Sequence, residues 1–308
     1  MPPIREIPVP ILLDTDMESD VDDVGALAIL HALADLGEAE ILAVVVCAGN
    51  PWSPLCADRL NHYFGRGELP VGTVRGPCVS RESKYTRQIA EEFPGRLTSP
   101  DGVPDALTVY RRTLAAQPDG SAVVVSIGYL TNLRNLLASG PDEFSDLAGR
   151  ELVARKVRLW ICMGGQFPSG REYNIYMDTE AARQTLAEWP TKIVFSGWES
   201  GLGQTGARLR ELPITSPVRR AYELYGRIPH KSWDLMTTLY AVRGIGRDRS
   251  GGYWDLSPRG RMPLAPDGSN TWQDDPAGNQ RYQLCPDEQG MAKLVAEIDD
   301  LLMRQPTL

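Results

Sequence analysis

The sequence predicts an α/β protein whose mainly parallel, doubly wound central sheet carries helices on both faces. Short continuous apolar runs, typical of strands covered on both sides, alternate with segments of helical periodicity through most of the 308 residues. Acidic side chains gather directly after the first apolar run, where open parallel sheets bind ligands. Near the C-terminus, residues 251–283 are rich in Gly, Pro and Asp, and this composition predicts a small antiparallel hairpin region.

The first β-α-β unit is complete by residue 46. Residues 11–13 (ILL) predict a buried strand, residues 24–36 place apolar side chains at helical spacing, and residues 41–46 (ILAVVV) predict the next strand. Gly37 ends the helix between them. The acidic loop that follows the first strand therefore lies at the carboxyl edge of the sheet.

The same alternation continues along the chain. Further strands are predicted at residues 70–74, 122–126, 157–163 and 192–195. Further helices are predicted at residues 55–64, 105–116, 130–137, 179–189, 218–225 and 233–242. Residues 80–101 are polar and weakly periodic, which predicts a loop or short helices.

We expect residues 1–308 to form a single domain, because no internal boundary is visible in the sequence. Residues 251–283 would be a hairpin-rich appendage of this domain. Residues 287–304 predict a C-terminal helix that packs on it, since apolar side chains recur there at helical spacing.

Charge and hydropathy exclude several classes of partner. The net charge is −8 and no face rich in lysine or arginine is visible, which argues against nucleic acid as a partner. No apolar run of 18 residues occurs, and the N-terminal segment lacks the apolar stretch of a secretory signal. We therefore expect a cytoplasmic protein with a small-molecule substrate and no membrane partner.

Acidic residues are concentrated in residues 10–27 (PILLDTDMESDVDDVGAL), which hold five aspartates and one glutamate. Like charges held close together raise one another's pKa unless a cation or strong donors compensate. Hard oxygen ligands that converge on one point suit Ca²⁺ or Mg²⁺. The stretch therefore predicts a metal site, and the alternative is a solvated loop whose aspartates cap the following helix.

The stretch DTDMESDVDDVGAL at residues 14–27 resembles the acidic N-terminal signature of the nucleoside hydrolase family, of the inosine-uridine preferring type, whose commoner form reads DTDxGxDDxxAL. Further blocks occur in the order that the family has. They are CAGN (47–50), SIGYLTN (126–132), MGG (163–165) followed by REYNIYMDTEAA (171–182), and SWDLMTTLYAV (232–242). The resemblance covers roughly the first 240 residues and identifies the chain as a divergent member.

The resemblance implies a Ca²⁺-dependent hydrolase that cleaves the N-glycosidic bond of a ribonucleoside, or a related N-riboside, to free base and ribose. It also implies a role in purine and pyrimidine salvage and a possible homo-oligomer. Asp16 would accept a proton from a metal-bound water. The implied metal ligands are Asp16, Asp23, the backbone carbonyl of Ile127, and Asp234.

The implied sugar contacts are polar side chains from four of these blocks: Asp22, Asn50, Glu172, Asn174 and Asp234. Glu172 would hold the 5′ end of the sugar and the others its hydroxyls, for which Asp and Asn are natural hydrogen-bond partners. The cleavage passes through an oxocarbenium-like sugar, which nearby carboxylates stabilise. On local evidence alone, Asn50 and Asn174 could equally be turn or cap residues, and Glu172 a solvated loop residue.

Two departures from the family pattern affect the site. This chain has two more residues between Asp16 and Asp22, and the stretch includes Asp20, to which we assign no role. Trp233 stands where many relatives have a histidine; tryptophan cannot donate a proton near neutral pH, although it can stack on a base. His230 is one candidate for the missing acid.

Other positions bear on the leaving group. Lys84 and Tyr85, in the polar loop, are further candidates for the acid. The segment between Gly165 and Glu172 is shorter than in the nucleoside-cleaving relatives and lacks the asparagine found there, for which Gln166 is a substitute.

Two alternatives from other classes stay open. ILLDTD also resembles the nucleophile strand of haloacid-dehalogenase-type phosphatases, in which Asp14 would attack phosphorus and Asp16 would act as acid and base. That alternative leaves Asp22, Asp23 and the SWD block unexplained. The other is a catalytically idle relative that binds a nucleoside or pentose.

Overall fold

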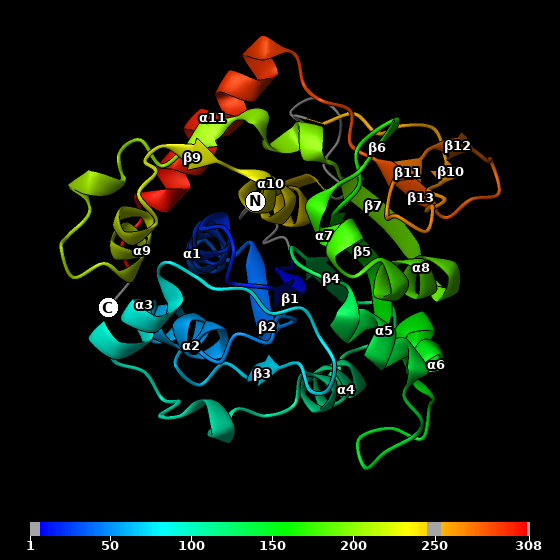
Figure 1. Ribbon diagram of the computed structural model, residues 1–308, viewed down its shortest axis with the longest axis horizontal. Helices are drawn as coiled ribbons and strands as arrows, with labels where there is room; N and C mark the ends of the chain where they lie inside the picture. Colours follow the sequence, from blue (N-terminus) through cyan, green and yellow to red (C-terminus); the bar gives the residue numbers. More distant parts are fainter. Residues whose placement is uncertain (1–6, 245–253, 307–308) are drawn as a thin grey trace, which may run out of the picture.

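The computed structural model describes residues 7–244 and 254–306. Within these residues, nine strands form one sheet (Figure 1). Across the sheet they are β12 (Gln273–Asp274), β10 (Gly260–Arg261), β13 (Gln280–Tyr282), β7 (Lys192–Ser196), β5 (Val157–Met163), β4 (Ala122–Ser126), β1 (Val9–Thr15), β2 (Ala39–Val46) and β3 (Val71–Thr73). Neighbours from β13 to β3 pair in parallel, whereas β10 pairs antiparallel with β12 and β13. The predicted mainly parallel sheet with a small antiparallel region is confirmed.

The strand order reverses direction at β1. From β1 the chain proceeds outward through β2 and β3 on one side, and through β4, β5 and β7 on the other. The loops that follow β1 and β4 therefore diverge and leave a crevice between them, which is where open α/β sheets bind ligands. The acidic stretch after β1 opens into this crevice.

Helices cover both faces of the sheet, as predicted (Figure 1). Their bounds are α1 Asp22–Asp35, α2 Ser53–Tyr63, α3 Thr86–Glu92, α4 Ala106–Ala116, α5 Thr131–Ala138, α6 Gly149–Lys156, α7 Tyr173–Met177, α8 Thr179–Glu188, α9 Pro217–Tyr225, α10 Trp233–Leu239 and α11 Glu288–Leu302. Alternate residues of β1 point to opposite faces. Ile11 and Leu13 join a core with α1, α2, α10 and α11, while Leu12 joins a second core with α4, α5 and α6.

Some predicted elements match the structure, and others differ from it. The predicted strands 122–126 and 157–163 coincide with β4 and β5, and residues 80–101 contain the short helix α3. The sequence did not predict α6 or α7, because α6 buries few apolar side chains and α7 has five residues. The predicted helix 233–242 is α-helical to Leu239 and continues as a π-helical segment, Tyr240–Gly244.

The C-terminal part follows its predicted pattern. Of the predicted hairpin region, residues 251–253 lie outside the described residues, and the remainder carries β10, β11 (Asn270–Thr271), β12 and β13. Through β13 it joins the edge of the central sheet, and β11 pairs with β6 (Ser169–Gly170). The predicted helix 287–304 is α11. In the part of the chain that the structure describes, no helix is both long and apolar enough to span a membrane.

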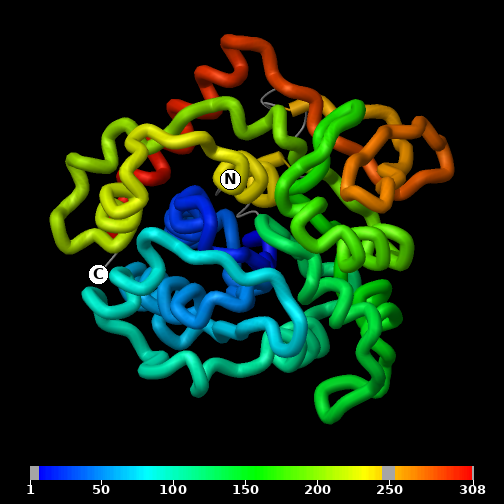
Figure 2. The backbone as a smooth tube through the Cα atoms, viewed as in Figure 1, coloured from blue at the N-terminus to red at the C-terminus, as the bar shows by residue number. Residues whose placement is uncertain are grey.

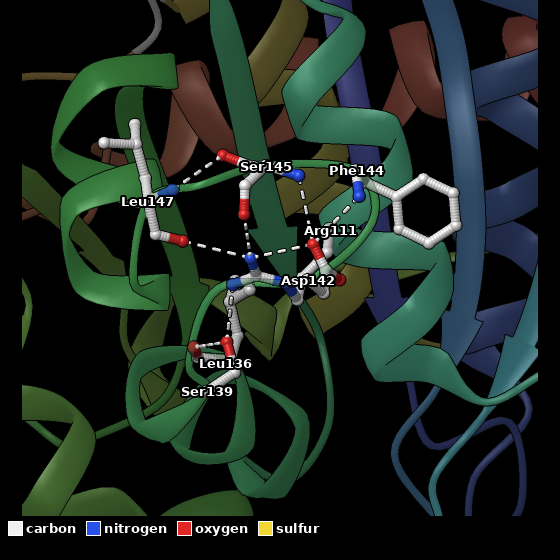
Figure 3. Close-up of polar contacts among 7 residues, drawn as sticks. All are labelled: Arg111, Leu136, Ser139, Asp142, Phe144, Ser145 and Leu147. Carbon is white, nitrogen blue, oxygen red and sulfur yellow. Dashed lines mark hydrogen bonds and ion pairs between the residues drawn. The ribbon is translucent and has the colours of Figure 1, made fainter.

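A buried arginine and its partners, which we call the Arg111 network, tie the connection between α5 and α6 to α4 (Figure 3). The guanidinium of Arg111 donates to both carboxylate oxygens of Asp142 at 2.6 and 2.9 Å and to the hydroxyl of Ser139 at 2.8 Å. It also donates to the carbonyls of Ser145 and Leu147 at 3.1 and 3.0 Å. The hydrogen bond from Arg111 holds the pKa of Asp142 below its usual value. This network is therefore matched in charge and in hydrogen bonds.

Candidate active site

A cavity of about 350 Å³ opens at the carboxyl end of the central strands. Its lining combines carboxylates, aromatic rings and small polar groups: Asp16, Ser19, Asp20, Asp22, Asp23, Ile127, Met163, Glu172, Tyr173, Asn174, Trp198, Trp233 and Asp234. The structure thus brings together predicted site residues from four of the five sequence blocks; Asn50, from the remaining block, is the exception.

Four buried aspartates, which we call the acid cluster, form one wall of the cavity: Asp16, Asp22, Asp23 and Asp234. Asp16 directly follows β1, and Asp22 and Asp23 form the first turn of α1. Asp234 lies in the first turn of α10, which is distant in sequence but lies beside α1 (Figure 2). Carboxylate oxygens of Asp22, Asp23 and Asp234 lie within 4.8 Å of one another. Two helix starts therefore converge on one point.

The acid cluster is short of positive partners. Burial raises the pKa of Asp16, Asp22 and Asp234 well above the usual range, and the neighbouring carboxylates raise it further. Burial also raises the pKa of Asp23, to about 6, although Thr15 and the backbone N–H of Met17 donate hydrogen bonds to it. Among the described residues that line the cavity, none is basic. An all-oxygen donor set with unmatched negative charge fits a hard divalent cation.

Residues at the start of α7 form another part of the cavity wall. The carboxylate of Glu172 caps this helix and accepts hydrogen bonds from the backbone N–H groups of Asn174 (2.8 Å), Ile175 (3.2 Å) and Gly165 (3.3 Å). Burial raises the pKa of Glu172 to about 7. The side-chain amide of Asn174 donates to the carbonyl of Met163 at 3.4 Å. Glu172 and Asn174 are thus fixed in the cavity wall, and their roles toward a sugar stay predictions.

Asn50 is placed differently from the other predicted contacts. It is buried, but it does not line the cavity. Its amide donates to the carbonyl of Arg81 at 3.1 Å and accepts from the backbone N–H of Trp52 at 3.0 Å. These are the bonds of a turn residue.

The loop between Asp16 and Asp22, which holds the two additional residues, begins with buried side chains. Met17 adopts a left-handed conformation with φ of 47°, which is uncommon for a side chain of this kind. Glu18 is buried and accepts hydrogen bonds from the backbone N–H of Arg81 (3.0 Å) and the hydroxyl of Tyr129 (3.1 Å). Burial raises the pKa of Glu18 to about 7. Sequence reasoning gave Glu18 no role, and its place in the acid-rich stretch was the available signal.

Asp20 has a histidine partner, which the acid cluster lacks. Its Oδ1 accepts a hydrogen bond from Nε2 of His230 at 2.5 Å and another from the backbone N–H of Val21 at 2.8 Å. Burial raises the pKa of Asp20, but the hydrogen bond from His230 and its charge outweigh burial and bring the pKa below the usual value. His230 does not line the cavity, so a proton from it would have to pass through another group.

The other suggested leaving-group residues also lie outside the cavity lining. The hydroxyl of Tyr85 donates a hydrogen bond to the backbone carbonyl of Asp20 at 2.7 Å. The ammonium of Lys84 lies over the ring of Tyr225. The backbone N–H of Gln166 donates to Asn270, at the hairpin region.

Two tryptophans form the aromatic wall. The indole N–H of Trp233 donates to the carbonyl of Trp198 at 2.8 Å, and both rings line the cavity. The ammonium of Lys231 lies 5.1 Å from the ring of Trp233 and 5.4 Å from that of Trp198. A Cβ at Gly201 would clash with the ring of Trp233, so this glycine permits the close approach. Sequence reasoning missed Trp198, for which a position just after a buried strand was the signal.

Asp14, the nucleophile of the phosphatase alternative, faces away from the cavity. It accepts hydrogen bonds from the hydroxyl of Tyr110 at 2.8 Å and the amide of Asn132 at 3.1 Å, and it does not line the cavity. Burial raises its pKa to about 7. A nucleophile must reach its substrate, so this placement counts against that alternative.

Comparisons with known proteins bear on the family and the fold of the chain. The family model described as inosine-uridine preferring nucleoside hydrolase matches residues 11–247. No curated protein matches the chain in a sequence search.

Solved structures of low sequence identity share the fold. An inosine-uridine preferring nucleoside hydrolase from Bacillus anthracis has 14% identity and a TM-score of 0.69, over 95% of this chain and 99% of that one. A purine-preferring ribonucleoside hydrolase from Gardnerella vaginalis has 15% identity and a TM-score of 0.71, over 95% and 99% of the two chains. The type III effector protein XopQ, complexed with adenosine diphosphate ribose, has 18% identity and a TM-score of 0.66, over 97% and 95%.

Proposed function

The chain belongs to the inosine-uridine preferring nucleoside hydrolase family, whose members are hydrolases acting on N-glycosyl compounds, and from this premise we propose its reaction. We propose that it cleaves the N-glycosidic bond of a ribonucleoside, or a related N-riboside, to free base and ribose in the presence of Ca²⁺. The observation that carries the proposal is the acid cluster: four buried carboxylates converge beside a cavity whose described lining has no basic residue.

In this proposal Ca²⁺ is held by oxygen donors from both sides of the crevice, namely Asp16, Asp23, Asp234 and the backbone carbonyl of Ile127. The donor set fits because every ligand is an oxygen and the buried negative charge is otherwise unmatched. When bound, the ion would lower the pKa of a coordinated water and orient ribose hydroxyls.

Individual residues of the chain would then carry out separate parts of the reaction. Asp16 takes the proton of the attacking water, and Asp22 accepts hydrogen bonds from the sugar hydroxyls. The carboxylates of the cluster stabilise the positive charge that develops on the sugar as its bond to the base breaks. Glu172 and Asn174 hold the 5′ end and a hydroxyl of the sugar, and Trp233 stacks on the base.

Finer expectations accompany this proposal. They are a single domain over residues 1–308, a cytoplasmic location, a role in purine and pyrimidine salvage, and assembly into a homo-oligomer. The sugar contact of Asn50 belongs with them, and would require its amide to exchange a backbone partner for a hydroxyl.

Release of reducing sugar from a panel of ribonucleosides tests the reaction. We expect release with Ca²⁺, loss of release after chelation, and a large loss in Asp16→Asn. Asp14→Asn serves as the matched control on the same strand. Phosphate release from monoesters with Mg²⁺, abolished by Asp14→Asn and unaccompanied by sugar release, would favour the phosphatase instead.

The idle relative is the second candidate, because no histidine is among the described residues that line the cavity. Binding of a nucleoside with no release of sugar at any pH would support it.

A further inference from the structure

Asp20 is an acid of the cavity that the proposed reaction leaves unused. Its side chain is 33% exposed, whereas its partner His230 is 5% exposed. Since Asp20 lines the cavity and His230 does not, the exposed part of the pair is the carboxylate. The pair thus presents an acceptor to a ligand and keeps the imidazole behind it.

The position of Asp20 is firmly fixed. Both hydrogen bonds with measured distances end on Oδ1, from Val21 at 2.8 Å and from His230 at 2.5 Å, and Tyr225 adds a side-chain hydrogen bond. His230 in turn lies on the short strand β9 (His230–Lys231), whose partner is β8 (Gln204–Thr205). A carboxylate that accepts from His230 requires the proton on Nε2. The arrangement therefore offers a pre-oriented anionic acceptor.

Asp20 adjoins one part of the proposed site directly and the other through His230. On one side, ligand atoms of Asp20, Asp22 and His230 lie within 4.8 Å of one another, and Asp22 is the proposed sugar contact. On the other side, the ring of His230 lies edge-on to Trp233, with centroids 6.4 Å apart, and Trp233 is the proposed base platform. A base stacked on Trp233, with its sugar held by Asp22, would turn an edge toward Asp20.

We propose that Asp20, positioned by His230, selects the leaving group by accepting a hydrogen bond from an exocyclic amino group of the base. This inference rests on the proposed function, because the sugar and base subsites define where Asp20 lies. Bases that carry an amino group at this edge, as adenine- and cytosine-type bases do, would be preferred over bases with an oxo group there. An oxo group would place a second acceptor against the carboxylate, with no proton between them.

The test compares substrates in which the amino group is replaced by an oxo group with a neighbouring ring N–H: adenosine with inosine, and cytidine with uridine. We measure kcat/KM with Ca²⁺, and in parallel the shift in melting temperature that each nucleoside produces. The wild type should favour the amino member of at least one pair by about tenfold to a hundredfold. In Asp20→Asn, Oδ1 can keep its two donors while the new amide N–H₂ faces the base, so the preference should reverse toward the oxo member.

Variants of His230 separate positioning from folding. His230→Gln retains an N–H donor for Oδ1 and should keep the amino preference. His230→Leu removes the donor and should reduce the preference, while the melting temperature without nucleoside reports its effect on the fold. If Asp20→Asn does not fold, these two variants still decide the role of the pair.

The outcomes separate this inference from the proposed function. Equal loss of kcat/KM for both members of each pair, or no preference in the wild type, would overturn the role of Asp20 even if sugar is released. If no nucleoside is cleaved, an amino preference in the melting shifts that reverses in Asp20→Asn supports the inference and refutes the reaction. Absence of both cleavage and a preferential shift would refute both.

Discussion

Two buried charged groups of this molecule are built in opposite ways, the Arg111 network and the acid cluster. In the first, a guanidinium meets a carboxylate, a hydroxyl and backbone carbonyls, and the pKa of Asp142 is lowered. In the second, carboxylates meet one another, and the pKa of Asp16, Asp22 and Asp234 is raised. A buried charge whose partner is present is compensated within the fold, whereas one without a partner identifies where a ligand is to be expected.

The contrast follows from where each group sits. The Arg111 network ties the connection between α5 and α6 to α4 (Figure 3), and none of its residues lines the cavity. The acid cluster lies at the point where the strand order reverses, at the carboxyl ends of β1 and β4. Variants and conditions that act on one group and not on the other separate the two.

Asp16→Asn should lower kcat/KM for sugar release on the order of 10³-fold, because the variant loses the base for the attacking water and a metal ligand. Its stability without Ca²⁺ should not fall, since an amide adds no charge to the repulsion within the cluster. Initial rates and thermal unfolding of the metal-free protein measure both quantities. Activity near the wild-type level would remove Asp16 from the mechanism.

Arg111→Met should lower the free energy of unfolding by about 3 kcal/mol, because Asp142 and two carbonyls lose their donor. We use the lower end of the usual range, since the Asp142 side chain is 29% exposed. Urea denaturation measures the change. With Ca²⁺ present the rate of sugar release should stay within about twofold of wild type; a large loss of rate would show that the two groups are not independent.

Ca²⁺ at about 100 times its dissociation constant should raise the free energy of unfolding by about 2.7 kcal/mol in the wild type. Arg111→Met should keep this gain and Asp23→Asn should lose most of it. Denaturation of the three proteins with Ca²⁺ and with chelator gives the comparison. An undiminished gain in Asp23→Asn would place the ion elsewhere.

The metal-free protein should lose stability as the pH rises. Burial raises the pKa of Asp14 to about 7 and of Asp23 to about 6, so the folded state holds these protons more tightly than the unfolded state does. Their contribution is complete below about pH 4 and is lost as the pH rises through 6 and 7. Asp142, whose pKa is lowered in the folded state, contributes to stability in the opposite direction. Its contribution is lost only as the pH falls into the acid range.

Melting temperatures measured between pH 5 and pH 8 check this dependence. We expect a fall on the order of 2–4 °C for each kcal/mol lost, and a smaller fall with Ca²⁺. A melting temperature that rises steadily over this range without metal would contradict the sign.

The sequence predicted the fold well where local pattern and tertiary structure agree. Strands such as 122–126 are continuous apolar runs, and they appear as β4 with the same bounds. Helix α6 was not predicted, because packing rather than periodicity determines it: Leu152 and Val153 are its buried apolar side chains. The caps of α8 and α9, Asp178 and Ser216, follow ordinary helix chemistry.

Part of the candidate site could likewise be predicted from the sequence, and part of it could not. The acid cluster could be predicted because its members lie in a contiguous motif and one later block. The pair of Asp20 and His230 could not, since its residues lie 210 positions apart and short-range spacing says nothing about their contact. Trp198 also required the folded chain, because its carbonyl accepts from the indole N–H of Trp233, which lies 35 positions later.

Calorimetric titration of the metal-free protein with Ca²⁺ near pH 7, in two buffers of different ionisation enthalpy, shows whether the acid cluster binds a cation. If the acid cluster is a cation site, a single Ca²⁺ binds per chain and protons are released, because carboxylates with raised pKa must ionise to become ligands. Asp23→Asn should bind far more weakly, and Arg111→Met as the wild type does. Absence of Ca²⁺ binding in the wild type, or equal binding in Asp23→Asn without proton release, would contradict the assignment of the cluster.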